Sequence, residues 1–161
     1  MSDARPLTSG EADLARSMFG DAIDYAPVRI VLGKWAFFQP RNVVMSPWGS
    51  IHFHPHGTAY CDDFSHAGIN SQGLFIHEMT HIWQHQSGIF LPLRRVPWAR
   101  YDYAVKPGWI LRKYGIEQQA EIVRHAFLIG LGASFAGAPP LSQLQTILPF
   151  QPPHRHDPGV A

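Results

Sequence analysis

Cysteine is nearly absent from this sequence, because Cys61 is the only one among 161 residues. A single thiol excludes an intramolecular disulfide and any zinc cluster built from several cysteines. Charged residues are also scarce, at 16%, and the formal net charge is only +1. This balance provides no broad basic field for nucleic acid or for an anionic membrane, so we expect neither as a partner.

Long hydrophobic runs are missing as well. The most apolar late stretch, residues 126–138, is too short and too rich in glycine to cross a bilayer. The first ten residues are polar and lack the apolar segment of a signal peptide. We therefore expect a cytoplasmic protein, or one that is exported by a route that needs no signal peptide.

The length and the 45% of hydrophobic residues fit one catalytic domain with a substantial core. Prolines gather towards the C-terminus, so we place the domain at 1–138 and a proline-rich tail at 139–161. We expect this tail to be extended apart from a short helix at 142–148, with its last ten residues disordered.

Helical periodicity and capping signals predict three helices, at 8–20, 70–88 and 115–130. Thr8 and Glu11 have the spacing of a capping box, Asn70 or Ser71 could cap the second helix, and Gly88 could end it. Strand-like runs lie at 28–32, 42–45 and 50–54. The turn-rich break between the last two runs predicts a β-hairpin.

The second predicted helix carries the sequence His77-Glu78-Met79-Thr80-His81, which matches the pattern His-Glu-x-x-His. Residues four apart project from one face of a helix, so both imidazoles could bind a single metal ion with Glu78 beside it. A chain of this composition would contain about 0.015 such matches by chance. The alternative is a core helix whose histidines merely form hydrogen bonds.

Two imidazoles leave a metal one protein ligand short, and the third helix offers a carboxylate. Glu117 and Glu121 lie one turn apart on one face of that helix, and the chain has only four glutamates. Glu117 could bind the metal, and Glu121 could accept a hydrogen bond from a ligating histidine. His85 is the local competitor, but on a straight helix its Cα lies about 12 Å from that of His77. A solvated helix face is the alternative for both glutamates.

Two other features could have a functional role. His52 and His54 alternate along the last predicted strand and could be a metal-ligand pair, although polar residues on the wet face of a sheet are the ordinary case. The segment 89–113 is rich in proline, tryptophan and tyrosine. We expect it to fold over a cleft, and simple packing of its aromatic side chains is the alternative.

The His-Glu-x-x-His motif, followed by Glu-Gln-Gln-Ala-Glu at 117–121, resembles the gluzincin branch of the zincin metallopeptidases. The resemblance implies a division of roles: metal ligands His77, His81 and Glu117, general base Glu78, and a supporting carboxylate Glu121. The family has Asp or Asn at the last of these positions, where this chain has a glutamate.

More closely, residues 7–130 resemble small bacterial proteins labelled Vgr-related, on the runs 7–11 and 115–125 and on the motif helix. Those are compact metallopeptidase-like domains, similar to ones found in polymorphic toxins and near type VI secretion genes. The resemblance implies an α+β fold, a minimal zincin-like domain. Its small, twisted, mostly antiparallel sheet would pack on the motif helix and on a second, glutamate-bearing helix. The hairpin at 42–54 would form the sheet edge along which a peptide binds.

The sequence thus predicts a zinc-dependent peptidase that binds one Zn²⁺ and hydrolyses a peptide or protein substrate, with Glu78 as general base. Tyr103, Tyr114 and His125 are the candidates for a donor that stabilises the transition state. The rival interpretation is a catalytically weak or inactive metal-stabilised interaction domain, an accessory of a bacterial secretion system with a partner there. Imidazole also suits copper, nickel and iron. The sequence leaves the substrate preference and the oligomeric state open.

Overall fold

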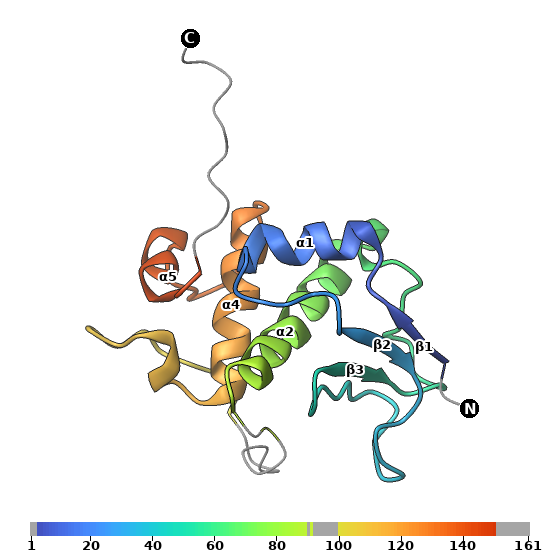
Figure 1. Cartoon of the computed structure of the whole chain (residues 1–161). Coiled ribbons are helices and arrows are strands. Elements are labelled where there is room, and N and C mark those ends of the chain that lie inside the picture. The colour runs from blue at the N-terminus through green and yellow to red at the C-terminus, as the bar shows by residue number, and fades with distance from the viewer. Residues whose placement is uncertain (1–2, 90, 92–99, 151–161) are drawn as a thin grey trace.

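The computed structural model describes residues 3–89, 91 and 100–150. In this part of the chain a small sheet and a group of helices pack around one core, and α2 (Ile69–Gln86) runs between the sheet and α4 (Ile116–Gly130) (Figure 1). The α+β class that the sequence predicts is confirmed. No helix in the described ranges is long and apolar enough to cross a membrane.

The sheet contains the strands β1 (Asp3–Pro6), β2 (Arg29–Leu32) and β3 (Ser50–Phe53), in the order β1-β2-β3. β1 pairs with β2 antiparallel, whereas β2 pairs with β3 parallel. The sheet is therefore mixed, and only one of its two pairings is of the antiparallel kind that we expected. The sequence analysis did not predict β1, because its four residues lack the apolar alternation of a strand.

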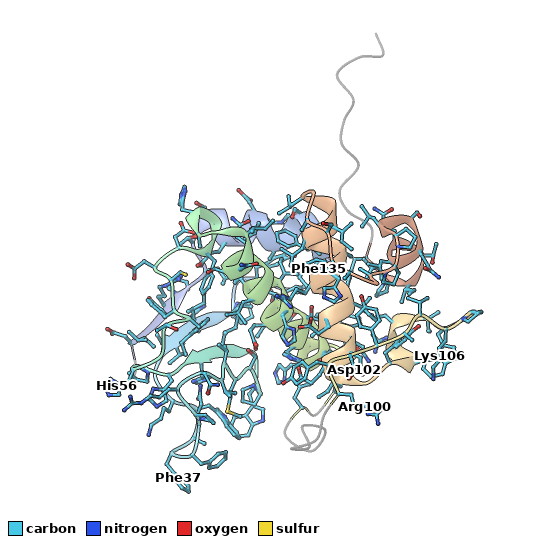
Figure 2. The ribbon with its side chains drawn as sticks, turned by 180° about the vertical axis from the view of Figure 1, so that it is seen from behind. Phe37, His56, Arg100, Asp102, Lys106 and Phe135 are labelled. Atoms are coloured by element: carbon cyan, nitrogen blue, oxygen red, sulfur yellow. The ribbon has the colours of Figure 1, made fainter. Side chains whose placement is uncertain are left out.

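The predicted hairpin at 42–54 forms only in part, since residues 42–45 are not a strand. Of its first arm, only Met45 pairs with β3, through a single antiparallel bridge to His52. The side chain of the buried Gln39 explains the difference, because its amide nitrogen donates to the carbonyl oxygens of both Val43 and His52, at 2.8 and 3.0 Å. His52 O still accepts from Met45 N at 3.1 Å in the bridge, whereas Val43 O is an acceptor that a continued ladder would have used. Phe37 lies at the tip of the resulting β2–β3 connection (Figure 2).

The helices agree well with the prediction: α1 (Ser9–Phe19), α2 (Ile69–Gln86), α4 (Ile116–Gly130) and α5 (Leu141–Ile147). Two short 3₁₀ turns, η1 (Phe64–His66) and η2 (Leu111–Lys113), precede α2 and α4. The capping box of Thr8 and Glu11 forms as predicted. The N-cap of α2 is Gly68, two residues before Asn70, the earlier of the two predicted caps, and it makes no side-chain bond. Gly88 follows α2 with a φ of 87°, a backbone conformation that favours glycine.

Part of the predicted tail packs into the core. Leu144, Ile147 and Phe150 are buried. The ring centroid of Phe150 lies 4.9 Å from that of Phe19 and 4.9 Å from that of Trp83. Residues 141–150 therefore belong to the same hydrophobic core as α1 and α2. The expected disorder of the last ten residues falls outside the described residues.

Candidate metal centre

α2 is buried on nearly all sides, since every residue from 75 to 84 is buried. Five of these buried side chains are polar: Thr80, which donates to Ile76 O of its own helix, and His77, Glu78, His81 and Gln84. Burial of so many polar groups in one helix is costly unless each has a partner. Their partners come mainly from α4, which packs directly against α2 (Figure 1).

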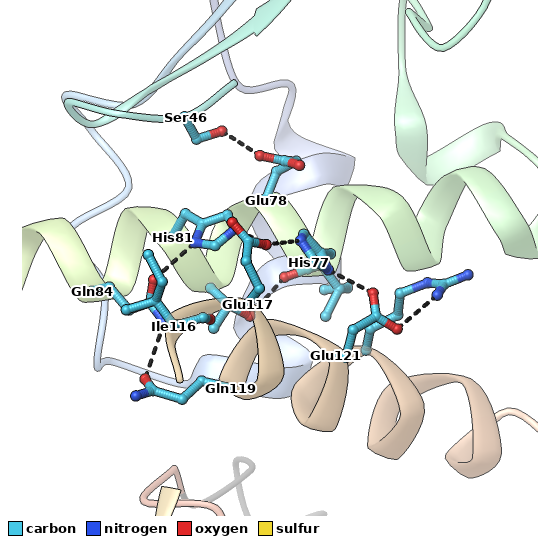
Figure 3. Close-up of polar contacts among 12 residues, drawn as sticks. Ser46, His77, Glu78, His81, Gln84, Ile116, Glu117, Gln119 and Glu121 are labelled. Carbon is cyan, nitrogen blue, oxygen red and sulfur yellow. Dashed lines mark hydrogen bonds and ion pairs between the residues drawn. The ribbon is translucent and has the colours of Figure 1, made fainter. Parts of the chain in front are cut away.

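The imidazoles of α2 and a carboxylate of α4 converge at one point. Glu117 Oε2 lies 3.2 Å from His77 Nε2 and 3.1 Å from His81 Nε2 (Figure 3). All three side chains are buried, and one ligand atom from each lies within 4.8 Å of the others. In the part of the chain that the structure describes, these residues form the group that could hold a metal ion.

The other ring nitrogens of the two histidines show that the group suits a cation. His77 Nδ1 lies 2.9 Å from Glu121 Oε1, and His81 Nδ1 lies 2.8 Å from Gln84 Oε1. Both oxygens are acceptors, so each Nδ1 is the donor. A neutral imidazole with its proton on Nδ1 has a lone pair on Nε2. Both lone pairs then face the Glu117 carboxylate, an arrangement that a metal ion between them satisfies.

Gln84 helps to position His81, a role that the sequence analysis did not predict. Its amide nitrogen donates to Ile116 O and to Gln119 Oε1, both at 3.0 Å, which leaves its oxygen to accept from His81 (Figure 3). The side chain thus ties His81 to the start of α4. The only signal in the sequence was its position three residues after His81, which also fits an ordinary helical glutamine.

Glu78 has a partner from outside the helices. Ser46 Oγ donates to Glu78 Oε2 at 2.6 Å, and the two side chains are 0% and 3% exposed. Ser46 comes from the β2–β3 connection, where the sequence analysis placed only a turn. This bond fixes the orientation of a carboxylate that lies between the two histidines along α2 (Figure 3).

Glu121 connects His77 to further charged groups. It accepts from Arg124 Nη1 at 3.0 Å, and His125 Nε2 lies 3.6 Å away. Burial acts to raise the pKa of Glu121, but the hydrogen bond and charge of His77, with those of Arg124, outweigh it and lower the pKa. Glu121, which stands where the gluzincin pattern has Asp or Asn, is therefore ionised and accepts from His77 Nδ1.

The three candidate transition-state donors lie in two places, with Tyr103 beside His125 and Tyr114 elsewhere. Tyr103 OH lies 2.8 Å from His125 Nδ1, and both line a cavity of about 290 Å³ together with Glu121 and Phe135. Burial, followed by the charge of Glu121, raises the pKa of Tyr103 to about 12. Tyr114 instead is buried in the core, where its hydroxyl accepts from Lys106 N at 3.0 Å.

His52, His54 and His85 supply no atom to this group. The ring of His85 packs against Gly49, where a Cβ would lie 3.2 Å from His85 Cδ2. His52 Nδ1 is buried without a hydrogen-bond partner, and His54 Nδ1 accepts from His56 N at 3.0 Å. The structure therefore does not bring His85, His52 or His54 into the described metal group.

The aromatic-rich segment 89–113 contacts the centre in its described part. The ring of Tyr101 stacks on that of His77, with centroids 6.1 Å apart and an interplanar angle of 22°. Residues 90 and 92–99 lie outside the described residues, so the predicted closure over a cleft stays a prediction for them.

The metal-free protein is expected to bind zinc more tightly as the pH rises towards about 9. Burial lowers the pKa of His77, but hydrogen bonds to Glu117 and Glu121 and the charge of Glu78 outweigh it and raise the pKa from 6.5 to about 9. Zinc must displace that proton. The raised pKa also stabilises the metal-free fold below about pH 6.5, and this stabilisation is lost as the pH rises through about 9.

This pH dependence is measured by zinc titration against a competing chelator and by thermal unfolding in EDTA, both across that pH range. A zinc affinity that stays constant across the range would contradict ligation by a protonatable His77.

Comparison with known proteins identifies relatives of this chain. No model of a known protein family matches the sequence. The type VI secretion system spike protein VgrG2b of Pseudomonas aeruginosa is 43% identical over 134 residues, an alignment that covers 77% of this chain and 13% of VgrG2b. The chain therefore spans only a small part of that protein's length. The structure of the effector domain of P. aeruginosa VgrG2b matches with a TM-score of 0.75 and 37% identity, covering 88% of this chain and 80% of that domain. The resemblance to Vgr-related proteins is thereby confirmed, and this chain belongs to the family of the VgrG2b effector domain.

Proposed function

We propose that this chain is a zinc-dependent peptidase. The observation that carries the proposal is the convergence of His77 Nε2, His81 Nε2 and Glu117 Oε2 in a buried site. Two imidazoles and a carboxylate are a ligand set of catalytic zinc, which keeps a further position for water or substrate. Glu78 lies one residue after the first of these histidines and is oriented by Ser46.

Bound zinc would supply an activated water and polarise the scissile carbonyl. Glu78 would accept the proton of the attacking water and then donate it to the leaving amine. Tyr103 is our candidate for the donor to the oxyanion, because its raised pKa keeps the phenol protonated. His125 would hold this phenol in place through the 2.8 Å contact.

The biological setting follows from the relatives. VgrG2b is by name a spike protein of a type VI secretion system, and the matched domain is its effector domain. We infer that this chain acts in the same kind of setting, on a peptide or protein substrate.

A metal-stabilised interaction domain without useful hydrolysis is the second candidate. The observation in its favour is Tyr101, whose ring stacks on that of His77 and would restrict access to the metal from that side. Such a domain would need the same buried ligands. A metal that binds the folded state and not the unfolded chain stabilises the fold.

Metal analysis combined with a peptide-library cleavage assay tests the two candidates. The purified protein is expected to contain one zinc ion per chain and to cleave a subset of peptides. EDTA should abolish the cleavage, and added zinc should restore it. Zinc binding without cleavage of any peptide or denatured protein would favour the interaction domain.

A further inference from the structure

The connection between β2 and β3, which we call the aromatic loop (residues 33–49), exposes a group of large apolar rings. Phe37 is 89% exposed, Phe38 62% and Trp48 56%. Their ring centroids form a chain, at 5.2 Å between Phe37 and Phe38, 6.3 Å between Phe38 and Trp35, and 5.3 Å between Trp35 and Trp48. Contiguous exposed apolar side chains of this kind mark an interaction site.

The loop holds these rings outwards through its own hydrogen bonds. Gln39 is only 3% exposed, accepts from Trp35 N at 2.8 Å and donates to the carbonyls of Val43 and His52. Burying a glutamine while exposing two adjacent phenylalanines reverses the usual preference of these residue types. The exposed rings are therefore part of a turn with its own hydrogen bonds, and Phe37 projects from it (Figure 2).

The stretch of sequence that carries the rings is basic and contains no acid. Residues 25–61 contain no aspartate or glutamate, but they contain Arg29, Lys34 and Arg41. Lys34 Nζ donates to Phe37 O at 3.3 Å, which places this cation at the tip. The ring of His54 lies 5.7 Å from that of His56, centroid to centroid. The pKa of His54 is lowered, first by desolvation and then by the charges of Lys34, His56 and Arg41. The net charge of the whole chain conceals this local excess.

We propose that the aromatic loop binds the surface of a membrane that contains anionic lipids. Phe37 and Phe38 would enter the headgroup region, and Lys34 and Arg41 would contact lipid phosphates. A protein partner fits less well, because a specific interface buries about 800 Å² on each side with close shape complementarity. A projecting turn with two adjacent rings offers a small convex surface, which a fluid bilayer accommodates.

This binding would place the metal centre beside the membrane. Ser46, at the base of the aromatic loop, donates directly to Glu78 of the centre. Trp48 follows it by two residues and belongs to the exposed group. The proposal concerns a surface without metal ligands, so it stands or falls independently of the peptidase activity.

Co-sedimentation of the whole chain with lipid vesicles tests the proposal. Vesicles of phosphatidylcholine with phosphatidylglycerol are expected to bind the protein, and vesicles of phosphatidylcholine alone to bind it much less. Phe37→Ser combined with Phe38→Ser should weaken binding at least about tenfold, because two large apolar side chains no longer leave water. Lys34→Gln combined with Arg41→Gln should remove the preference for phosphatidylglycerol.

Ile110→Ser is the matched control, since this apolar side chain is 57% exposed outside the aromatic loop. It should leave vesicle binding unchanged. Phe37→Ser alone, at a side chain almost fully in water, provides a second variant if the double substitution reduces folding. Failure of the unaltered protein to bind anionic vesicles would overturn the proposal. So would dimerisation that Phe37→Ser abolishes, because a second copy would then be the occupant of this surface.

Discussion

Glu78→Gln is expected to lower peptidase turnover by at least about 100-fold, the usual effect of losing a general base. Glutamine has the same shape and can still accept the hydrogen bond of Ser46 Oγ, which is 2.6 Å long in this structure. Its amide cannot take a proton from water. The converging ligand group consists of His77, His81 and Glu117 and contains no atom of Glu78. Glu78→Gln should therefore keep its zinc.

The measurement compares turnover and zinc content of Glu78→Gln with those of Asp13→Asn. Asp13 has an exposed carboxylate on α1, so its replacement makes the same chemical change far from the metal ligands in sequence and should leave activity intact. A Glu78→Gln variant that retains turnover would show that another group is the base. A variant that loses zinc would show that Glu78 is itself a ligand.

Glu117→Ala is expected to weaken zinc binding more than about 100-fold, because outer partners of metal ligands alone contribute 10- to 100-fold. Glu117 Oε2 contacts Nε2 of both His77 and His81 and is the only acidic atom in the converging group of described residues. Zinc present at about 100 times its dissociation constant stabilises a fold by about 2.7 kcal/mol. The variant should lose this stabilisation, so that EDTA no longer changes its unfolding temperature.

His85→Ala is the control on the same helix. His85 lies four residues after His81 but packs against Gly49, so its removal should leave the zinc content unchanged. Glu117→Gln, which keeps the size of the side chain, replaces the alanine variant if that one does not fold. Zinc loss in His85→Ala with retention in Glu117→Ala would reverse the assignment of the third ligand.

The helices and the ligand group could be predicted from the sequence because their signals are local. The capping box at Thr8 and the apolar periodicity of α2 and α4 depend on residues a few positions apart. Glu117 and Glu121 could be connected to the motif because glutamate is scarce in the chain and both lie on one helical face. The structure brings both to the histidines of the motif.

The remaining parts depend on contacts between distant segments. Ser46 reaches Glu78 across 32 positions of sequence, and Gln84 reaches Gln119 across 35. A serine in a turn and a glutamine on a helix carry no local sign of such partners. The predicted hairpin forms only at the Met45–His52 bridge for the same reason, because the Gln39 side chain binds Val43 O, an acceptor that strand periodicity assigns to a ladder.

The two histidines of the motif are unequal as electron donors. The Nδ1–H of His77 is held by the ionised carboxylate of Glu121, whereas that of His81 is held by the neutral amide of Gln84. A carboxylate partner raises the basicity of an imidazole ligand. His77 is therefore the stronger donor to a bound cation. Its partner comes from α4, whereas Gln84 belongs to α2 itself, so separating the two helices would remove Glu117 and weaken His77 together while leaving the partner of His81 in place.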